Sequence, residues 1–384
     1  MVKKTQRNQR YGEDAFGLIY TGEDNLQLKD LTQSRAVAAV PFGGRYRCID
    51  FILSDLVNTG VTSVGLIAQK NYHSLMDHLG SGREWDLHRK REGLFIIPPF
   101  MTKENTGLYR GTVDAFRAAL GFVRRCPQKY IILSGSHTIF NMPFTDMLAK
   151  HIKTNADVTL LYYEENEPDS EDIRRDLYFD VEADGRVSNI SIDPYKKPNS
   201  HRSADVIIMD KQLFIETVDT AYARGDRNYV RDVLVRRASG WKVMGYCIEG
   251  FVARLSSVRS FFDKNMELLD EKIQRDLFNP THPIYTKVKD ETSARYGEHA
   301  CSRCSVVADG CEIRGTVEKS VLFRGVKVGE GAIVRNSIIM QGVDIGNNCI
   351  LEHVIIDKGA QIHDGRTLTG YDSFPVIVKK NTEV

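Results

Sequence analysis

The first two thirds of the chain alternate short apolar runs, rich in β-branched residues, with segments whose apolar residues recur every three or four positions. The first pattern is typical of buried strands and the second of helices that bury one face. Their alternation predicts a doubly wound, mostly parallel α/β sheet. We expect strands at 15–20, 62–68, 129–133, 157–163 and 204–209. We expect helices at 49–59, 72–79, 112–125 and 144–153.

The C-terminal part follows a different period. Apolar residues recur six positions apart, as in Leu322, Val328 and Val334, and these blocks repeat at an offset of seventeen. Gly325 and Gly342 share that offset. Sixfold apolar spacing with glycine at the corners is typical of a left-handed hexapeptide β-helix, in which three segments form one coil. Fewer than four coils are visible in the sequence. We expect the repeat to serve as a packing surface for another domain or subunit.

These patterns divide the chain into four parts. Residues 1–14 form a basic tail, which we expect to be a solvated end. Residues 15–270 form the α/β domain, and residues 301–384 form the β-helix. Between them, residues 271–300 are polar and contain Pro280 and Pro283, which predicts a linker.

Charge and cysteine content narrow the possible partners. The 384 residues include 52 Lys and Arg against 51 Asp and Glu, so we expect neither nucleic acid nor membrane as a partner. With no long apolar stretch and no signal peptide, we expect a cytoplasmic protein with reduced thiols. Cys301 and Cys304 are spaced as zinc ligands are, with His299 nearby. Because Cys311 and Cys349 occupy apolar positions of the repeat, we predict core cysteines and no metal site.

Several long motifs resemble one enzyme family. They are Leu28–Ala36, Val40–Phe51, Gln69–His78 and Tyr109–Ala115. In this order they resemble glucose-1-phosphate adenylyltransferase, a nucleotidyltransferase with a Rossmann-like domain and a β-helix, and the resemblance covers residues 16–362. It implies transfer of an adenylyl group from ATP to glucose 1-phosphate. That chemistry needs backbone N–H groups around the triphosphate, cations on the phosphates and carboxylates on Mg²⁺.

The residues that the resemblance assigns to this chemistry are mostly replaced. Gln27 stands in place of a phosphate-binding arginine, Val37 in place of a lysine, and Ser136 and Arg254 in place of the two metal carboxylates. What remains on the nucleotide side, as a remnant of the loop and its surroundings, is Gly22, Glu23, Asn25 and Gln69. Side chains at former glycines keep the backbone away from a phosphate.

The size of these losses decides the prediction. One preorganised electrostatic group contributes roughly 3 kcal/mol to lowering a barrier, so losing both metal carboxylates should leave almost no catalysis. The segments Ser81–Leu87 and Gly93–Phe100 resemble the catalytically degenerate D-type subunit of the Gram-positive bacterial enzyme. The resemblance therefore implies a regulatory subunit that joins an active partner in a mixed tetramer. We expect it to hold no cofactor itself, with Mg²⁺ and ATP used by the partner.

Two groups of residues could still bind ligands. The resemblance places a sugar phosphate at Tyr109, Arg110, Gly111, Thr112, Lys197 and Ser203. It places allosteric sugar-phosphate effectors at Arg35 and Arg47. Inherited packing and ordinary surface arginines are the alternatives.

Three other functions remain open at this stage. The chain could be an active adenylyltransferase with an atypical site, or a free-standing phosphosugar sensor. It could also be an acyltransferase that uses His353 or His363 of the β-helix as a base.

Overall fold

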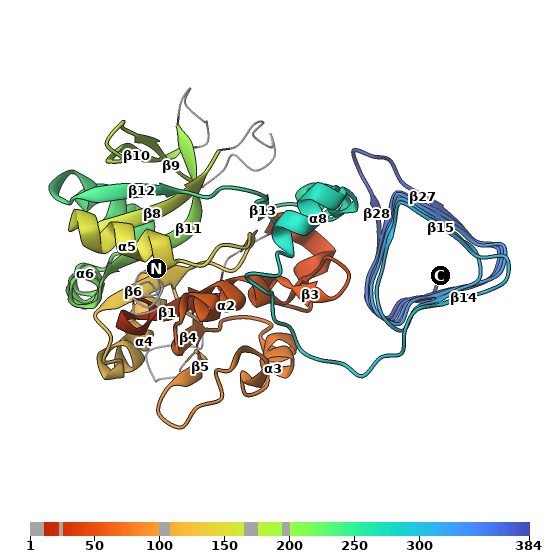
Figure 1. Cartoon of the computed structure of the whole chain (residues 1–384), viewed down its shortest axis with the longest axis horizontal. Helices are drawn as coiled ribbons and strands as arrows, with labels where there is room; N and C mark the ends of the chain where they lie inside the picture. Colours follow the sequence, from red (N-terminus) through yellow and green to blue (C-terminus); the bar gives the residue numbers. More distant parts are fainter. Residues whose placement is uncertain (1–10, 23–25, 100–107, 165–175, 194–199) are drawn as a thin grey trace, which may run out of the picture. The chain divides into compact units, whose positions relative to one another are not determined.

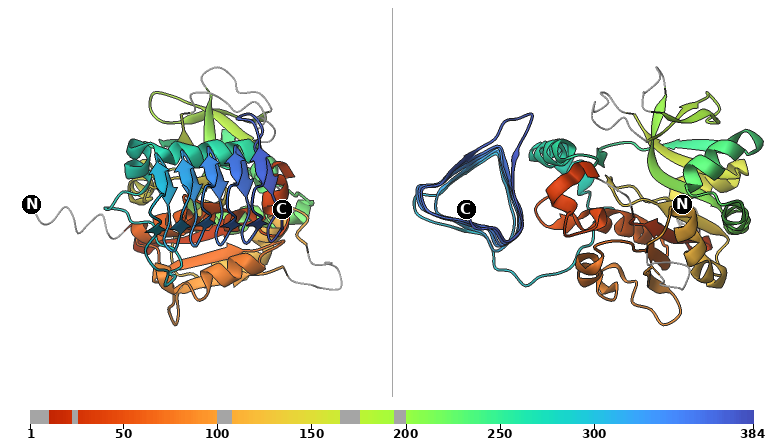
Figure 2. Two further views of the ribbon diagram at one scale, coloured as in Figure 1. Left: turned by 90° about the vertical axis from the view of Figure 1, so that its right-hand side faces the viewer. Right: turned by 180° about the vertical axis from the view of Figure 1, so that it is seen from behind.

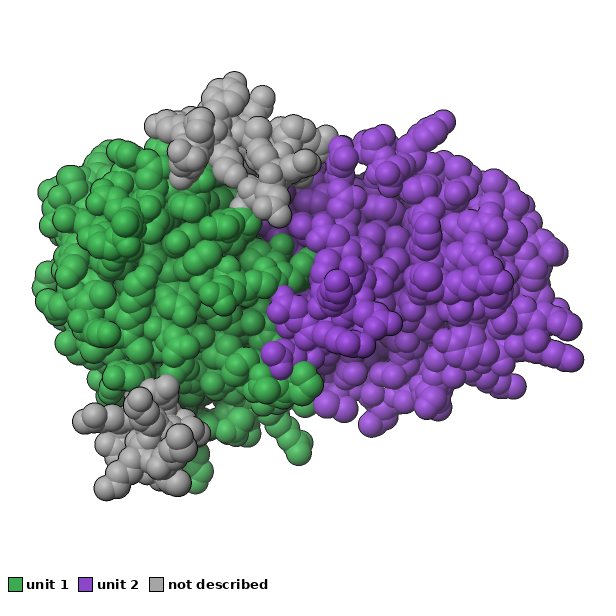
Figure 3. Space-filling model, turned by 45° about the horizontal axis from the view of Figure 1, so that its top comes forward, with its two compact units in different colours: residues 1–24, 51–252, 280–285 green, residues 25–50, 253–279, 286–384 purple. Residues whose placement is uncertain are grey.

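The chain forms two compact units in the computed structural model, which describes residues 11–22, 26–99, 108–164, 176–193 and 200–384. The expected tail therefore lies largely outside the described residues. Unit 1 contains residues 1–24, 51–252 and 280–285, and unit 2 contains residues 25–50, 253–279 and 286–384 (Figure 3).

Unit 1 is built on a nine-stranded sheet in which β1, β4, β5 and β6 are parallel neighbours (Figure 1). A second group of strands, β8 to β12, extends the sheet through the long strand β11, which pairs antiparallel with β6, β8 and β9. All five expected strands are confirmed. The strands are β1 Ala15–Tyr20, β4 Ser63–Ile67, β5 Gly93–Ile97, β6 Tyr130–Ser134, β8 Val158–Tyr163, β9 Asp176–Val181, β10 Val187–Asp193, β11 His201–Asp210 and β12 Val243–Cys247.

The helices of unit 1 pack their apolar stripes against this sheet. Helix α4 shows how: Val113, Phe116, Leu120 and Val123 are buried in the core, while Arg124 lies exposed in its last turn. The four expected helices are confirmed to within one residue at each end. The helices that lie in or enter this unit are α2 Cys48–Thr59, α3 His73–Leu79, α4 Thr112–Arg125, α5 Thr145–Thr154 and α6 Lys211–Arg224. No helix among the described residues is long and apolar enough to cross a membrane.

Unit 2 contains the expected β-helix, whose coils have a triangular cross-section (Figures 1 and 2). Its inward residues, such as Ile313, Val334 and Leu351, are fully buried, and so are Cys311 and Cys349, as predicted. Three parallel sheets of five strands form its faces. They are β14 Arg295–Tyr296, β17 Glu312–Ile313, β20 Lys327–Val328, β23 Asp344–Ile345 and β26 Gln361–Ile362; β15 Cys301–Arg303, β18 Thr316–Glu318, β21 Ile333–Arg335, β24 Ile350–Glu352 and β27 Thr367–Thr369; and β16 Val306–Val307, β19 Val321–Leu322, β22 Ile338–Ile339, β25 Val354–Ile356 and β28 Val376–Val378.

The β-helix is longer than the sequence pattern indicated. Each face has five strands, so the expectation of fewer than four coils is wrong. The early coils were missed because their offset differs: Cys301 pairs with Thr316 and Val306 with Val321, fifteen residues apart. Later partners, such as Val321 and Ile338, are seventeen apart.

The segment expected to be a linker is ordered. Its first part forms helix α8 Glu271–Leu277, and the first β-helix strand, β14, begins at Arg295. Residues 280–285 belong to unit 1, where the N–H of Tyr285 donates to Ser54 Oγ at 2.8 Å and Asn58 Nδ2 donates to the Pro283 carbonyl at 3.1 Å.

Two further segments complete unit 2. One is the hairpin of β2 Pro41–Phe42 and β3 Tyr46–Arg47, whose turn contains Gly43 and Gly44 at positive φ. The other is helix α7 Val258–Met266, whose N-terminus is capped by reciprocal hydrogen bonds between Ser257 and Ser260.

Candidate functional site

In parallel α/β sheets, ligands bind beyond the carboxyl ends of the strands, and in unit 1 the side chains of Tyr20 and Gln69 contact each other at this edge. The hydroxyl of Tyr20, at the end of β1, lies 3.0 Å from Gln69 Oε1 and 3.1 Å from the Gly22 carbonyl oxygen. Gln69 Nε2 in turn donates to the Tyr109 carbonyl at 3.3 Å. A Cβ atom on Gly22 would lie 2.1 Å from Gln69 Oε1, so the backbone has no spare room here. Glu23 and Asn25 lie outside the described residues.

The residues expected to bind a sugar phosphate lie at the start of α4, and their polar groups already have protein partners. The Tyr109 hydroxyl donates to the Pro98 carbonyl at 3.1 Å, and burial raises the pKa of Tyr109 to about 12. Thr112 Oγ1 accepts from the Tyr229 N–H at 2.8 Å.

The two residues between Tyr109 and Thr112 differ in exposure. Arg110 is exposed and pairs with Asp114 of its own helix at 2.9 Å. A Cβ atom on Gly111 would lie 2.3 Å from the Arg227 carbonyl oxygen, so this close approach requires glycine. Of these residues, Arg110 alone projects into solvent with a charge; Lys197 lies outside the described residues.

A polar cluster lies at the carboxyl end of β6. The buried Ser136 occupies the position that the resemblance assigns to a metal carboxylate. The next residue, His137, has Nε2 at 3.0 Å from Asp205 Oδ2. Asp205 has φ 57° in an irregular stretch of β11, and its N–H donates to Ser203 Oγ at 3.1 Å. The resemblance that includes Ser203 assigns a glycine to position 205, and glycine accepts such a φ without strain. Asp205 therefore adds a carboxylate to this cluster, and that carboxylate contacts the imidazole of His137 instead of lying next to a second acid.

This arrangement does not fit Mg²⁺, which binds through carboxylate oxygens in near-octahedral geometry. No three His, Cys, Asp or Glu side chains converge as metal ligands anywhere in the described part of the chain. The other replaced positions belong to unit 2: Gln27 is exposed, Val37 is buried, and Arg254 is half-buried in β13 Ala253–Arg254. None of these three side chains can supply a carboxylate.

Unit 2 contains a cluster of cations that the sequence only partly revealed. Burial lowers the pKa of Lys358, and the nearby charges of Lys289 and Arg47 lower it further. Burial and then Arg324 lower the pKa of Lys289, and burial and then Arg45 lower that of Arg324, while Glu291 raises both and Asp309 raises that of Arg324. Cations that depress one another's pKa in a partly desolvated site are arranged to receive an anion. The cationic cluster is therefore Arg45, Arg47, Lys289, Arg324 and Lys358.

Arg35 has a different environment from Arg47. It is 5% exposed, and its Nη2 lies 2.8 and 2.9 Å from the two carboxylate oxygens of Asp357, which is 2% exposed. Arg47 is half-buried, and its backbone N–H donates to Asp50 Oδ2 at 2.9 Å. An effector contact stays a prediction for both residues, but the Arg35 guanidinium has a buried carboxylate as partner.

Comparison with known proteins agrees with this architecture. Residues 17–171 match the nucleotidyl transferase family, and residues 287–374 match the GlmU-like C-terminal hexapeptide family. Glycogen biosynthesis protein GlgD of Bacillus subtilis (strain 168) is 35% identical over 324 residues, which cover 84% of this chain and 82% of that protein. GlgD of Geobacillus stearothermophilus is 39% identical over 311 residues, 80% of this chain and 79% of the relative. Glucose-1-phosphate adenylyltransferase of Clostridium novyi (strain NT) is 31% identical over 328 residues, 84% of each.

The chain belongs to the GlgD and glucose-1-phosphate adenylyltransferase family. Within this family's fold, four residues of the cationic cluster were not predicted from the sequence: Arg45, Lys289, Arg324 and Lys358. The repeat contained a signal for two of them: Arg324 and Lys358 each precede a corner glycine and lie two offsets of seventeen apart, so the coils bring them to the same corner. The sequence already shows Asp205 as an acid in place of a motif glycine, whereas its contact with His137 is known only from the structure.

Proposed function

We propose that this chain is a regulatory subunit of glucose-1-phosphate adenylyltransferase in glycogen biosynthesis, without catalytic activity of its own. The observation that carries the proposal is the cluster at the carboxyl end of β6, where Ser136 replaces a metal ligand and the carboxylate of Asp205 faces His137. The end of β1, where Tyr20 and Gln69 hydrogen-bond each other close to Gly22, supports it. Such a chain acts by changing an active partner, and a mixed tetramer is the proposed assembly.

The first test separates this function from an atypical enzyme. We expect the isolated chain to release pyrophosphate from ATP and glucose 1-phosphate at a rate at least about a hundredfold below that of a catalytic subunit, because it lacks the electrostatic groups of the reaction. Added to the catalytic subunit of the same organism, it should change the rate, substrate affinity or effector response of ADP-glucose formation.

The outcomes discriminate between the regulatory subunit, the active enzyme and the free-standing sensor. Mg²⁺-dependent turnover by the chain alone would favour the active enzyme. The free-standing sensor would be favoured if the catalytic subunit did not co-purify with the chain and kept the same kinetics when the chain was added.

The cationic cluster suggests how the subunit senses metabolites. We propose that it binds a sugar-phosphate effector, because burial lowers the pKa of Lys289, Arg324 and Lys358, and Arg324 and Lys289 lower the pKa of Lys289 and Lys358, respectively. An anion would relieve that repulsion and gain charge-assisted hydrogen bonds.

Replacing Arg47 or Lys358 with alanine should weaken the response of the mixed enzyme to a hexose bisphosphate by about tenfold, the effect of losing one charged hydrogen bond. The measurement is the effector concentration that gives half-maximal change in the rate of ADP-glucose formation. Lys327, an exposed cation on β20, provides the matched control, and K327A should respond like the wild type. If R47A, K358A and K327A all had the same half-maximal effector concentration, the cluster would not be the effector site.

A further inference from the structure

A pocket in unit 1 lies at the end of the strands opposite the candidate site. It has a volume of 700 Å³ and opens at the amino ends of β4 and β5, where Ser63 is the first residue of β4 and Glu92 directly precedes β5. Gly22 and Gln69 follow the opposite, carboxyl ends of β1 and β4. Five strand residues at about 3.3 Å each separate the two ends by about 16 Å. The pocket is therefore a separate site, of a size common for small-molecule ligands, roughly 300–1,000 Å³.

The floor of this pocket is aromatic. Phe95 of the edge strand β5 is 38% exposed, which is unusual for so large an apolar side chain. Its ring lies 5.2 Å from the ring of the buried Phe122 on α4, at an interplanar angle of 47°. Cys126 beside them is buried, and burial raises the pKa of its thiol to about 11, so it is neutral at physiological pH. The floor thus offers an uncharged face on which a flat ring can stack.

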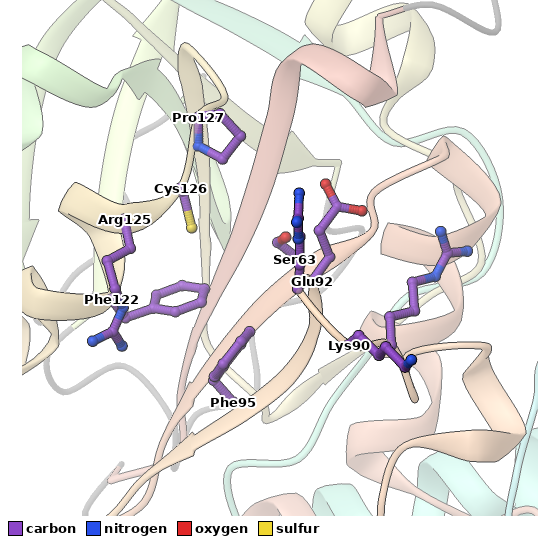
Figure 4. Close-up of a pocket in the computed structure, with 10 residues that line it drawn as sticks. Ser63, Lys90, Glu92, Phe95, Phe122, Arg125, Cys126 and Pro127 are labelled. Atoms are coloured by element: carbon purple, nitrogen blue, oxygen red, sulfur yellow. The ribbon is translucent and has the colours of Figure 1, made fainter.

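The rim is cationic. Figure 4 shows the two phenyl rings between Arg125, on the α4 side, and Lys90, on the loop before β5. Lys90, Arg91 and Arg125 are exposed and form no ion pair with any described residue, whereas Glu92 is the one carboxylate of the lining. The fourth lining cation, Arg89, pairs with Asp86 at 2.5 Å. The unpaired charges therefore sum to +2.

The adjacent helix end does not cancel this charge. The C-terminus of α4 carries a partial negative charge of roughly half a unit, which is smaller than the unpaired positive charge. In addition, Lys211 Nζ donates to the Cys126 carbonyl at 2.7 Å, so another cation satisfies one of the last carbonyls. The described charges of the lining therefore leave a net positive charge in the pocket.

We propose that this pocket binds a small aromatic anion of the nucleotide type, with its ring on Phe95 and its phosphate at Arg91 and Arg125. Guanidinium groups hold phosphate oxygens through paired, charge-assisted hydrogen bonds, and bases stack on aromatic side chains. A neutral sugar fits less well, because the lining offers it only one hydroxyl, on Ser63, and one carboxylate, on Glu92. A metal ion fits less well too, because one carboxylate and one neutral thiol are too few ligands.

The test is a fluorescence titration of the full chain with trinitrophenyl-ADP. We expect saturable binding in the wild type. The double variant R91A/R125A should bind at least about tenfold more weakly, since each lost guanidinium removes a charged hydrogen bond. F95A should weaken binding about fivefold, as expected for a lost stacking contact. R224A removes an exposed arginine at the end of α6, outside the pocket, and should bind like the wild type.

Competition then tests both halves of the ligand. AMP should displace the probe at lower concentration than either adenosine or inorganic phosphate. Wild-type affinity in R91A/R125A would overturn the proposal, because the probe would then occupy another site. Inorganic phosphate that competes as well as AMP would overturn the aromatic part. Single-stranded oligonucleotides whose affinity rises steeply with length would overturn it in favour of a nucleic-acid surface. A thermal unfolding midpoint equal to that of the wild type would confirm that a variant keeps its fold.

Discussion

Replacing Asp357 with alanine is expected to lower the free energy of unfolding of unit 2 by about 3–5 kcal/mol, because the change leaves the Arg35 guanidinium buried without its carboxylate. The two side chains are 5% and 2% exposed, and Arg35 Nη2 lies within 2.9 Å of both carboxylate oxygens. Asp357 also accepts a hydrogen bond from the backbone N–H of Lys358. The pair joins residues 322 positions apart, so its loss should detach the segment around Arg35 from the β-helix.

The design of this experiment uses the position of the tryptophans. Trp85 and Trp241 both belong to unit 1, so their fluorescence reports the unfolding of that unit, while amide hydrogen exchange of β25 reports unit 2. D357A should accelerate exchange in β25. K379A provides the control within the same unit, because Lys379 and Asp30 form an exposed pair at 3.1 Å, which should contribute less than about 1 kcal/mol.

A double variant separates the pair from the site around it. R35M/D357L replaces both charges with apolar side chains, and it should be more stable than D357A because no unpaired charge remains buried. If D357A and K379A had the same small effect, the pair would not hold the segment in place.

The pair also shows why part of the fold could not be predicted. The regular spacing of apolar residues identified the strands of unit 1 and the later coils of the β-helix, because each pattern is local and repeats. Residues 25–50 carry no such period, and nothing local indicates that Arg35 meets Asp357 of the β-helix. The early coils escaped detection for the related reason that an offset of fifteen, as between Cys301 and Thr316, breaks the register of seventeen.

The candidate site was predictable to a similar degree. The lost groups, such as Ser136 in place of an acid, could be found by comparing motif positions one at a time. The gained contact between His137 and Asp205 could not, because it depends on an irregular backbone in β11 that brings residue 205 to the end of β6. The cationic cluster is the same kind of case, since Lys289 and Arg47 meet only after the chain has formed unit 2.

Acidification is expected to destabilise unit 1 by about 3 kcal/mol through His151 alone. This imidazole is 2% exposed, and burial lowers its pKa from 6.5 to about 4, although Asp210 and Asp157 act in the opposite direction and Lys129 in the same one. Its Nδ1 lies 2.8 Å from Thr159 Oγ1, and the ring packs edge-on against Tyr130. Between pH 6.5 and 4 the unfolded chain binds a proton that the folded chain does not, so stability falls as pH decreases, by about 1.4 kcal/mol per pH unit.

The variant H151Q isolates this contribution. Glutamine can still hydrogen-bond Thr159 but does not titrate, so H151Q should be less stable than the wild type at pH 7, where the neutral histidine packs best, and should lose less stability on acidification. Urea unfolding followed by tryptophan fluorescence at pH 7, 6, 5 and 4.5 gives the difference at each pH, in which the effects of all other titrating groups cancel. H73Q changes an exposed histidine at the start of α3 and should keep the wild-type pH dependence. Parallel curves for the wild type and H151Q would show that His151 is not held neutral in the folded chain.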